Sequence, residues 1–405
     1  MKKLVTFLLL VISIVAVAQD IKVTTKDNDL KLAALPYYSY GKGLGITSPD
    51  SLFQLNIRFR MQNRVTYFEN EGEDAAYSGE IRRLRLRFDG YVGNPHFLYV
   101  IQLSFAPGDV GEIQDGENIN IIRDAAVFYR PNKHWSFLFG QTKLPGNRQR
   151  VNSSGALQLT DRSINNARFT IDRDFGFQAY YLNENKDKFS YNVKTAVSTG
   201  EGRNWTKSAD DGVALTGKLE LMPFGSFKND GTNFEGDVAR EKTPKLLLSG
   251  AFHQNNLARR TQGQLGGDLF EQKTMKSVLL DAMLKYNGWA LMSSYMSRSA
   301  KDPIAFNPDD ITEFNYVPVG SGMDYQLSYV FPTNYEIIGR FSTQNMHDDI
   351  KALTPDSKQY SLGVTKYLWE HAFKLQGEVT LSDLDYLDGS NKQNWYVRFQ
   401  LEIGI

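Results

Sequence analysis

Apolar and polar side chains alternate along most of this 405-residue chain, and turn residues separate the alternating segments. From Phe53 to Val65, nearly every odd position is apolar and every even position carries Gln, Asn or Arg. Successive side chains of a β-strand point to opposite faces, so each segment predicts a strand with one apolar face. About sixteen such segments can be placed, which is the repeated pattern of a transmembrane β-barrel. The last segment, Trp395 to Ile405, is expected to pair with the first and close the barrel.

The connections between these segments alternate between short and long. Bacterial barrels have short periplasmic turns and long outer loops, so the alternation supports an all-β, antiparallel barrel. Residues 223–244 are an exception, because a short periplasmic turn is expected there and the connection is long. The short connections lie near 93–95, 130–133, 287–288, 332–333 and 369–370, and the long ones near 69–79, 106–120, 144–173, 200–211, 255–272, 300–321, 344–357 and 383–392.

Arginines occupy the polar face of the first two predicted strands. An arginine facing lipid at the midplane costs roughly 2–4 kcal/mol, so five facing outward would cost on the order of 10–20 kcal/mol. A typical net stability is only about 5–15 kcal/mol, so these side chains are predicted to face the lumen. Arg82 falls on the lipid side of the pattern and is expected to reach the membrane interface. The five inward arginines are Arg58, Arg60, Arg83, Arg85 and Arg87.

The N-terminus predicts export. Lys2 and Lys3 precede an apolar run that ends in Ala16-Val17-Ala18, the layout of a secretory signal peptide over residues 1–18. An uncleaved anchor is the less favoured alternative, because the run is short for a membrane span. Residues 19–50 are interpreted as an N-terminal periplasmic segment and residues 51–405 as the barrel domain, placed in the outer membrane.

Composition excludes several classes of protein. The chain has no cysteine, which excludes a lipoprotein and a disulfide framework. Removing residues 1–18 takes away two of the 46 basic residues and none of the 46 acidic ones, leaving a formal charge of −2. No nucleic-acid partner is expected at this charge. The five histidines are scattered with no metal-spaced pair, so neither an enzyme nor a cofactor is expected, although a Ser-His-Asp triad on the barrel rim stays open.

The longest connection, residues 144–173, is rich in arginine. A barrel of about sixteen strands is wide enough for an aqueous channel, which such a loop can narrow by folding inward. A solvated outer loop that helps subunits to pack explains the same spacing equally well, and both interpretations stay open. Its cations include Arg148, Arg150 and Arg162, and acidic lumen candidates lie elsewhere at Asp89, Glu220, Asp281, Glu378 and Glu402.

Four motifs in order resemble the landmarks of the phosphate-selective porin O and P family. They are Arg82-Arg83-Leu84-Arg85-Leu86, Gly140-Gln141-x-Lys143-x-Pro145, Asp161-Arg162-Ser163 and Arg173-Asp174-x-Gly176. The resemblance implies a sixteen-stranded outer-membrane channel, commonly trimeric, with an inward third long loop and lumenal cations that guide anions. By motif match, that role falls on Arg83, Arg85, Lys143 and Arg162. The chain departs from the family pattern at Gly146, Asp161 and Ile405.

The predicted function is passive diffusion of small anions, phosphate or other, through an outer-membrane channel. The expected partners are these anions, outer-membrane lipid and two further copies of the chain. A general diffusion porin without strong ion preference and a non-conducting structural or adhesive barrel are the alternatives. The candidate anion pathway consists of Arg58, Arg60, Arg83, Arg85, Arg87, Lys143, Arg148, Arg150 and Arg162.

Overall fold

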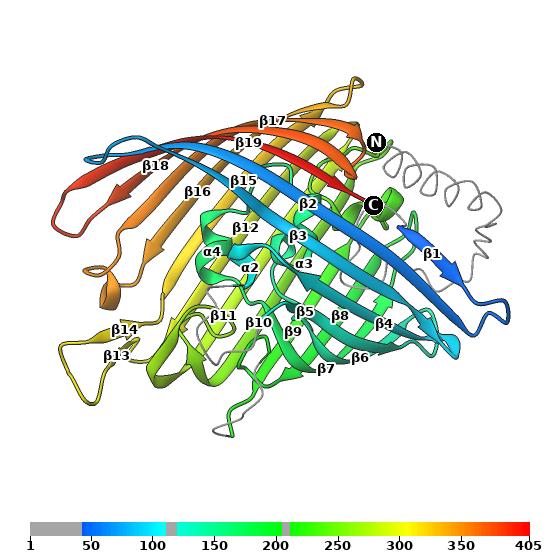
Figure 1. Cartoon of the computed structure of the whole chain (residues 1–405), viewed down its shortest axis with the longest axis horizontal. Coiled ribbons are helices and arrows are strands. Elements are labelled where there is room, and N and C mark those ends of the chain that lie inside the picture. Colours follow the sequence, from blue (N-terminus) through cyan, green and yellow to red (C-terminus); the bar gives the residue numbers. More distant parts are fainter. Residues whose placement is uncertain (1–42, 111–119, 205–210) are drawn as a thin grey trace, which may run out of the picture.

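The computed structural model describes residues 43–110, 120–204 and 211–405, and within them the chain forms one closed β-barrel (Figure 1). The main sheet has 17 strands, and all of them except β1 (Leu44–Thr47) form the barrel wall. Each wall strand pairs antiparallel with its neighbours, and β19 (Asn391–Gly404) pairs with β2 (Phe53–Asn70) to close the ring. The predicted all-β, antiparallel barrel of about sixteen strands is therefore confirmed. The predicted signal peptide, residues 1–18, lies outside the described residues, as does most of segment 19–50.

The alternation in sequence becomes an apolar outside and a mainly polar inside. Val127 and Phe177 are exposed on the outer surface, whereas Gln62, Ser104 and Asp124 are buried inside. Among the described residues, no helix is long and apolar enough to cross a membrane. The wall strands between β2 and β19 are β3 (Ala76–Val92), β4 (Asn94–Ser104), β5 (Ile122–Tyr129), β6 (Trp135–Lys143), β7 (Arg173–Asn183), β8 (Ser190–Ser198), β9 (Ala214–Met222), β10 (Lys245–Arg260), β11 (Asp268–Tyr286), β12 (Trp289–Ala300), β15 (Gly320–Val330), β16 (Tyr335–Met346), β17 (Asp356–Trp369) and β18 (Phe373–Asp385).

The two ends of the barrel have different connections, as predicted. At the periplasmic end, Gly93 alone joins β3 to β4, with a φ of 76° that suits glycine. The outer loops are shorter than predicted where strands continue beyond the membrane, since β2 and β3 leave only residues 71–75 between them. Loop 301–319 contains a small hairpin of β13 (Ile304–Phe306) and β14 (Phe314–Tyr316), and loop 347–355 contains a 3-10 turn, Asp348–Ile350.

The seam between the first and last strands is covered by the short strand β1. Pairing of β19 with β2 starts at Gly404 and Arg60, so the periplasmic part of β2 extends beyond it. β1 pairs there, with Leu44 opposite Ile57 and Thr47 opposite Gln54. An unpaired strand edge is a template for aggregation, and β1 removes it.

Two connections fold into the barrel. The first, residues 144–172, is termed the inward loop and contains α3 (Arg148–Val151), a 3-10 turn (Ser154–Ala156) and α4 (Ile164–Phe169). Figure 1 shows α3 and α4 inside the ring of strands, together with α2 (Pro107–Val110) from the preceding outer loop. The second is the long periplasmic connection, residues 223–244, termed the inward turn, with a 3-10 segment at Lys228–Asn233. Of the two interpretations of loop 144–173, the structure has the inward one.

Local sequence explains how the inward loop is shaped and seated. The Ser153 hydroxyl accepts a hydrogen bond from the Gly155 amide, and the Ser163 hydroxyl accepts one from the Asn166 amide, so each serine caps a short helical turn. The apolar ends of the loop bury themselves in the lumen. Leu144, Phe169 and Ile171 belong to one buried cluster with Met275, Leu279 and Met296 of the wall.

Candidate functional site

Arginines of β2 and β3 face one another across the strand pair. Arg58 lies opposite Arg87, and Arg60 lies opposite Arg85. Like charges in this position repel, so nearby carboxylates are needed to hold them together. Asp89 supplies one, since its carboxylate lies 3.3 Å from the Arg58 guanidinium and 2.7 Å from that of Arg87.

A second carboxylate comes from the short helix α2. Asp109 lies 2.7 Å from the Arg85 guanidinium and 2.8 Å from that of Arg123 on β5. Burial raises the pKa of Asp109, but the two guanidiniums outweigh burial and hold this pKa below its usual range. Helix α2 is thereby fixed to the arginines of β3 and β5.

A β-bulge brings Arg82 into the lumen. Gln62 pairs with Arg83 and Asn63 with Ile81, so Arg82 is an extra residue in β3. Its guanidinium lies 2.9 Å from the carboxylate of Asp161 in the inward loop. The prediction that Arg82 reaches the lipid interface is wrong, because a bulge resets the alternation that the sequence pattern assumes.

Asp161 fastens the inward loop to this wall. Besides Arg82, its carboxylate lies 3.1 Å from the Arg64 guanidinium and 3.3 Å from that of Arg83. Burial raises the pKa of Asp161, but Arg83, Arg82 and Arg64 together hold it well below the usual range. Asp161 therefore stays ionised at any pH near neutrality.

Arg60 is bound mainly by hydroxyl groups of the inward loop. It donates to Ser153 at 2.6 Å and to Ser154 at 2.9 Å, and the nearest carboxylate paired with it, Glu402, is 3.9 Å away. Ser154 also accepts a hydrogen bond from Arg85 at 3.1 Å. Residues 153–155 are termed the tip of the inward loop, and this tip thus lies against the arginines of β2 and β3.

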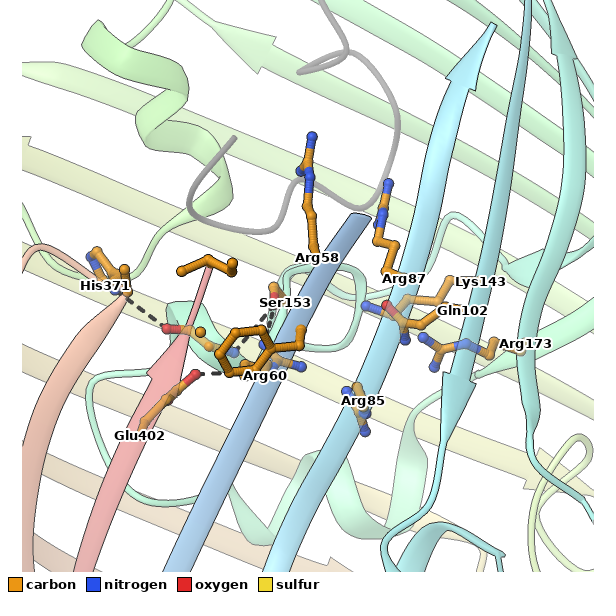
Figure 2. Close-up of a pocket in the computed structure, with 15 residues that line it drawn as sticks. Arg58, Arg60, Arg85, Arg87, Gln102, Lys143, Ser153, Arg173, His371 and Glu402 are labelled. Carbon is orange, nitrogen blue, oxygen red and sulfur yellow. Dashed lines mark hydrogen bonds and ion pairs between the residues drawn. The ribbon is translucent and has the colours of Figure 1, made fainter. Parts of the chain in front are cut away.

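A cavity of about 40 Å³ lies between this wall and the loop tip, enough for a few water molecules. In Figure 2, Arg58 and Arg87 point upward in the view, and Lys143, Gln102 and Arg173 lie close together at the right. Ser153, His371 and Glu402 also line it. The cationic side chains around the cavity are Arg58, Arg60, Arg85, Arg87, Lys143 and Arg173.

The predicted pathway residues therefore divide into two groups. Five of the nine line the cavity, and Arg173, which also lines it, was missed as a candidate although it stands in one of the recognised motifs. Arg173 lies 2.9 Å from the buried Asp124 carboxylate on β5. A residue at the start of a strand after a long loop could not be assigned to the lumen from spacing alone.

The other four predicted residues do not line the cavity. Their contacts are within the inward loop, or connect it to the inward turn or to β3. Arg162 donates to the carbonyl groups of Gln149 and Asn152 at 2.7 and 3.1 Å, within the loop. Arg150 forms an ion pair with Asp172 at 2.6 Å. Arg148 points to the inward turn, where it donates to the carbonyl groups of Thr232 and Phe234. The fourth, Arg83, donates to Gln62 at 2.6 Å in addition to its contact with Asp161.

The five predicted acidic lumen residues all contact lumenal groups. Asp89 pairs with Arg58, and Glu402 lies 3.9 Å from Arg60. Glu220 binds Lys194 and Lys218 at 2.7 and 3.0 Å. Asp281 accepts from the Arg148 amide and Glu378 from Thr160, both in the inward loop. In the part of the chain that the structure describes, no group of three or more His, Cys, Asp and Glu side chains could hold a metal ion.

Comparisons with known proteins agree with this geometry. A family model, phosphate-selective porin O and P, matches residues 53–317, close to two thirds of the chain. Among solved structures, the chain is similar to the outer membrane channel DcaP of Acinetobacter baumannii, with 14% identity over 89% of this chain and 99% of that one and a TM-score of 0.54. It is also similar to Salmonella typhi OmpF, with 12% identity, coverage of 89% and 100% and a TM-score of 0.56. No curated protein sequence matches the chain. At these identities, the solved structures show a shared barrel fold.

Proposed function

The chain belongs to the phosphate-selective porin O and P family and is an outer-membrane channel, and we propose that it conducts small anions passively. The channel uses no cofactor and no energy source in this proposal. Cations along the wall replace part of the hydration of a passing anion, as charged rings do in other selective pores. The pathway runs through the cavity described above, termed the basic cavity, which lies between the tip of the inward loop and the arginines of β2 and β3, termed the basic wall.

The charge around the cavity is the observation that carries this proposal. Six cationic side chains line it and Glu402 is the one carboxylate among the lining residues. Four further carboxylates, Asp89, Asp109, Asp124 and Asp172, form ion pairs with these cations. Six cations against five carboxylates leave an excess of one positive charge, which favours anions.

The identity of the anion is a finer part of the proposal. The family name supports phosphate, and bidentate guanidinium groups suit phosphate oxygens. The same wall also attracts chloride or a carboxylate, since the attraction is set by the sign of charge. Phosphate is therefore proposed as one permeant among small anions.

Planar-bilayer recordings under a potassium chloride gradient test the proposal. We expect a reversal potential of the anion-preferring sign, and a smaller block of chloride current by added phosphate when Arg85 and Arg87 are replaced by alanine. A cation-preferring reversal potential would refute the proposal. Conductance with no preference would instead identify a general diffusion porin.

A non-conducting barrel is the second candidate, favoured by one observation. Two connections fold into the lumen with many of their side chains buried, and the cavity between the loop tip and the arginines of β2 and β3 measures about 40 Å³. Purified, folded protein that gives no channel events in bilayers would establish this second function. Channel events of any selectivity would exclude it.

Export and assembly complete the proposal. A cleaved signal peptide at residues 1–18 delivers the chain to the outer membrane, and three copies assemble, as the family resemblance implies. Mass spectrometry of the mature N-terminus tests the first point, and chemical cross-linking in detergent tests the second. A mature chain that retains residues 1–18, or cross-linked species no larger than a dimer, would contradict these two parts.

A further inference from the structure

The periplasmic connection at residues 223–244 is fixed inside the barrel. Lys285 of β11 donates to three of its carbonyl groups, those of Gly231, Phe234 and Gly236, at 2.8, 3.0 and 2.8 Å. Asp237 accepts a hydrogen bond from the Gly288 amide at 2.8 Å. These four hydrogen bonds hold the inward turn in one position inside the lumen.

An apolar cluster beneath the inward turn gives independent support. Phe227 of the turn packs with four apolar side chains that point inward from β9 to β12. The lumenal positions of a barrel that carries water are polar, so apolar side chains there need a cover. The inward turn supplies it. The four wall residues are Met222, Leu247, Met283 and Met292.

The inward turn also meets the inward loop. The Glu235 amide donates to the Ala156 carbonyl at 3.3 Å, and the Glu235 carboxylate accepts from the Gln158 amide at 3.0 Å. Gln149 donates to the same carboxylate at 3.2 Å. The loop tip is therefore held between the turn on one side and Arg60 and Arg85 on the other.

Contacts of the turn reach the edge of the basic cavity. The Phe234 ring lies 5.0 Å from the ring of His371, which lines the cavity. Asn152, next to the cavity-lining Ser153, donates to the Thr232 carbonyl at 3.5 Å. The turn thus fills the lumen beside β9 to β12 and stops where the cavity begins.

We infer that residues 223–244 are a second constriction element that confines permeating ions to the basic wall. The turn closes the part of the lumen far from β2 and β3, and it presses the loop tip against the arginines. Its influence on selectivity rests on the proposed anion channel, whereas its influence on pore width does not.

Replacing the turn by a tight hairpin is the first test. The pairing of β9 with β10 ends at Leu221 and Leu248; extended by three residues in the same register, it would place residue 224 opposite residue 245, so Asn-Gly is designed to replace residues 225–244. We expect single-channel conductance to rise roughly twofold or more and anion preference to fall, because a wide barrel without this filling leaves an aqueous channel. Unchanged conductance and selectivity in a folded variant would overturn the inference.

A cysteine probe covers the case in which that variant fails to fold. The chain has no cysteine, so Asn233→Cys introduces a single thiol into the turn. Labelling with a negatively charged methanethiosulfonate reagent is expected to lower the conductance stepwise. The matched control is Leu387→Cys on the outer hairpin between β18 and β19, where the side chain is 64% exposed and labelling leaves the current unchanged. Complete labelling at 233, verified by mass spectrometry, with no change in current would contradict the inference.

The two proposals fail in different ways. If the anion channel is wrong, the unaltered protein already shows a cation-preferring or neutral reversal potential, yet shortening the turn still widens the pore. If the constriction is wrong, the unaltered protein prefers anions and both turn variants conduct as it does.

Discussion

Among the four arginines of β2 and β3 that line the cavity, Arg60 has the longest distance to its paired carboxylate, 3.9 Å, and Arg60→Gln removes its charge. The Ser154 hydroxyl also accepts a hydrogen bond from Arg85, so the loop tip keeps a polar partner on the wall while one charge is lost. A unit charge about 4 Å from an anion contributes about 1 kcal/mol in water and about 4 kcal/mol at an effective dielectric constant of 20. The cavity holds water, so about 1–2 kcal/mol is appropriate, which corresponds to roughly a 5- to 30-fold loss of anion occupancy.

The assay is the reversal potential under a salt gradient at low ionic strength. We expect the ratio of anion to cation permeability to fall about fivefold or more, and the difference to shrink in 1 M salt, where the screening length is about 3 Å. The control is Lys358→Ala, which removes one cation from the exposed outer face, where the Lys358 side chain is 52% exposed. Equal reversal potentials for wild type, Arg60→Gln and Lys358→Ala would refute the electrostatic reasoning.

Three further predictions concern the inward loop. Asp161→Asn leaves three guanidiniums without their shared carboxylate, and since Asp161 is 24% exposed we expect a loss of about 2 kcal/mol of unfolding free energy, measured by thermal melting. The unfolded chain protonates this group near pH 4 and the folded chain only at much lower pH. The difference between variant and wild type should therefore be constant above about pH 5 and shrink progressively as the pH falls below about 4; a difference lost between pH 7 and 5 would contradict this. Gly155→Val should lower conductance, because even a Cβ there would lie 2.6 Å from Arg60 and 2.7 Å from Glu402; an unchanged current would show that ions do not pass the loop tip.

Most of the fold follows from the alternation of side chains. The wall strands, the closure of β19 on β2 and the two classes of connection all result from a period of two and from the cost of placing arginine in lipid. The alternation does not reveal where an extra residue shifts the side chains of a strand from one face to the other. The bulge at Arg82 inserts one residue, and only the pairing of Gln62 with Arg83 and Asn63 with Ile81 reveals it.

The positive charge of the site was predictable from the sequence, but the partner of each cation was not. The inward arginines of β2 and β3 follow from strand phase alone, but their partners Asp109 and Asp161 come from loops, whose paths have no period. The roles of Arg148 and Arg150 depended on how the loop folds, and one of them bonds to a turn distant in sequence. The unusual length of residues 223–244 was visible, and the inward Met and Leu residues of β9 to β12 were the further indication that something covers them.

The inward loop also bears on how long the barrel stays closed. Its tip bonds to both sides of the seam, to Arg60 on β2 and, through the Gly155 carbonyl at 3.0 Å, to Lys374 on β18, next to β19. Gln62 and Glu402, which meet at this seam, are 340 residues apart in the chain, so ring closure carries a large entropic cost and comes late in folding. Contacts completed only at that step slow unfolding more than they speed folding. The inward loop therefore also stabilises the closed ring against opening at the seam, and its removal should shorten the lifetime of the closed ring.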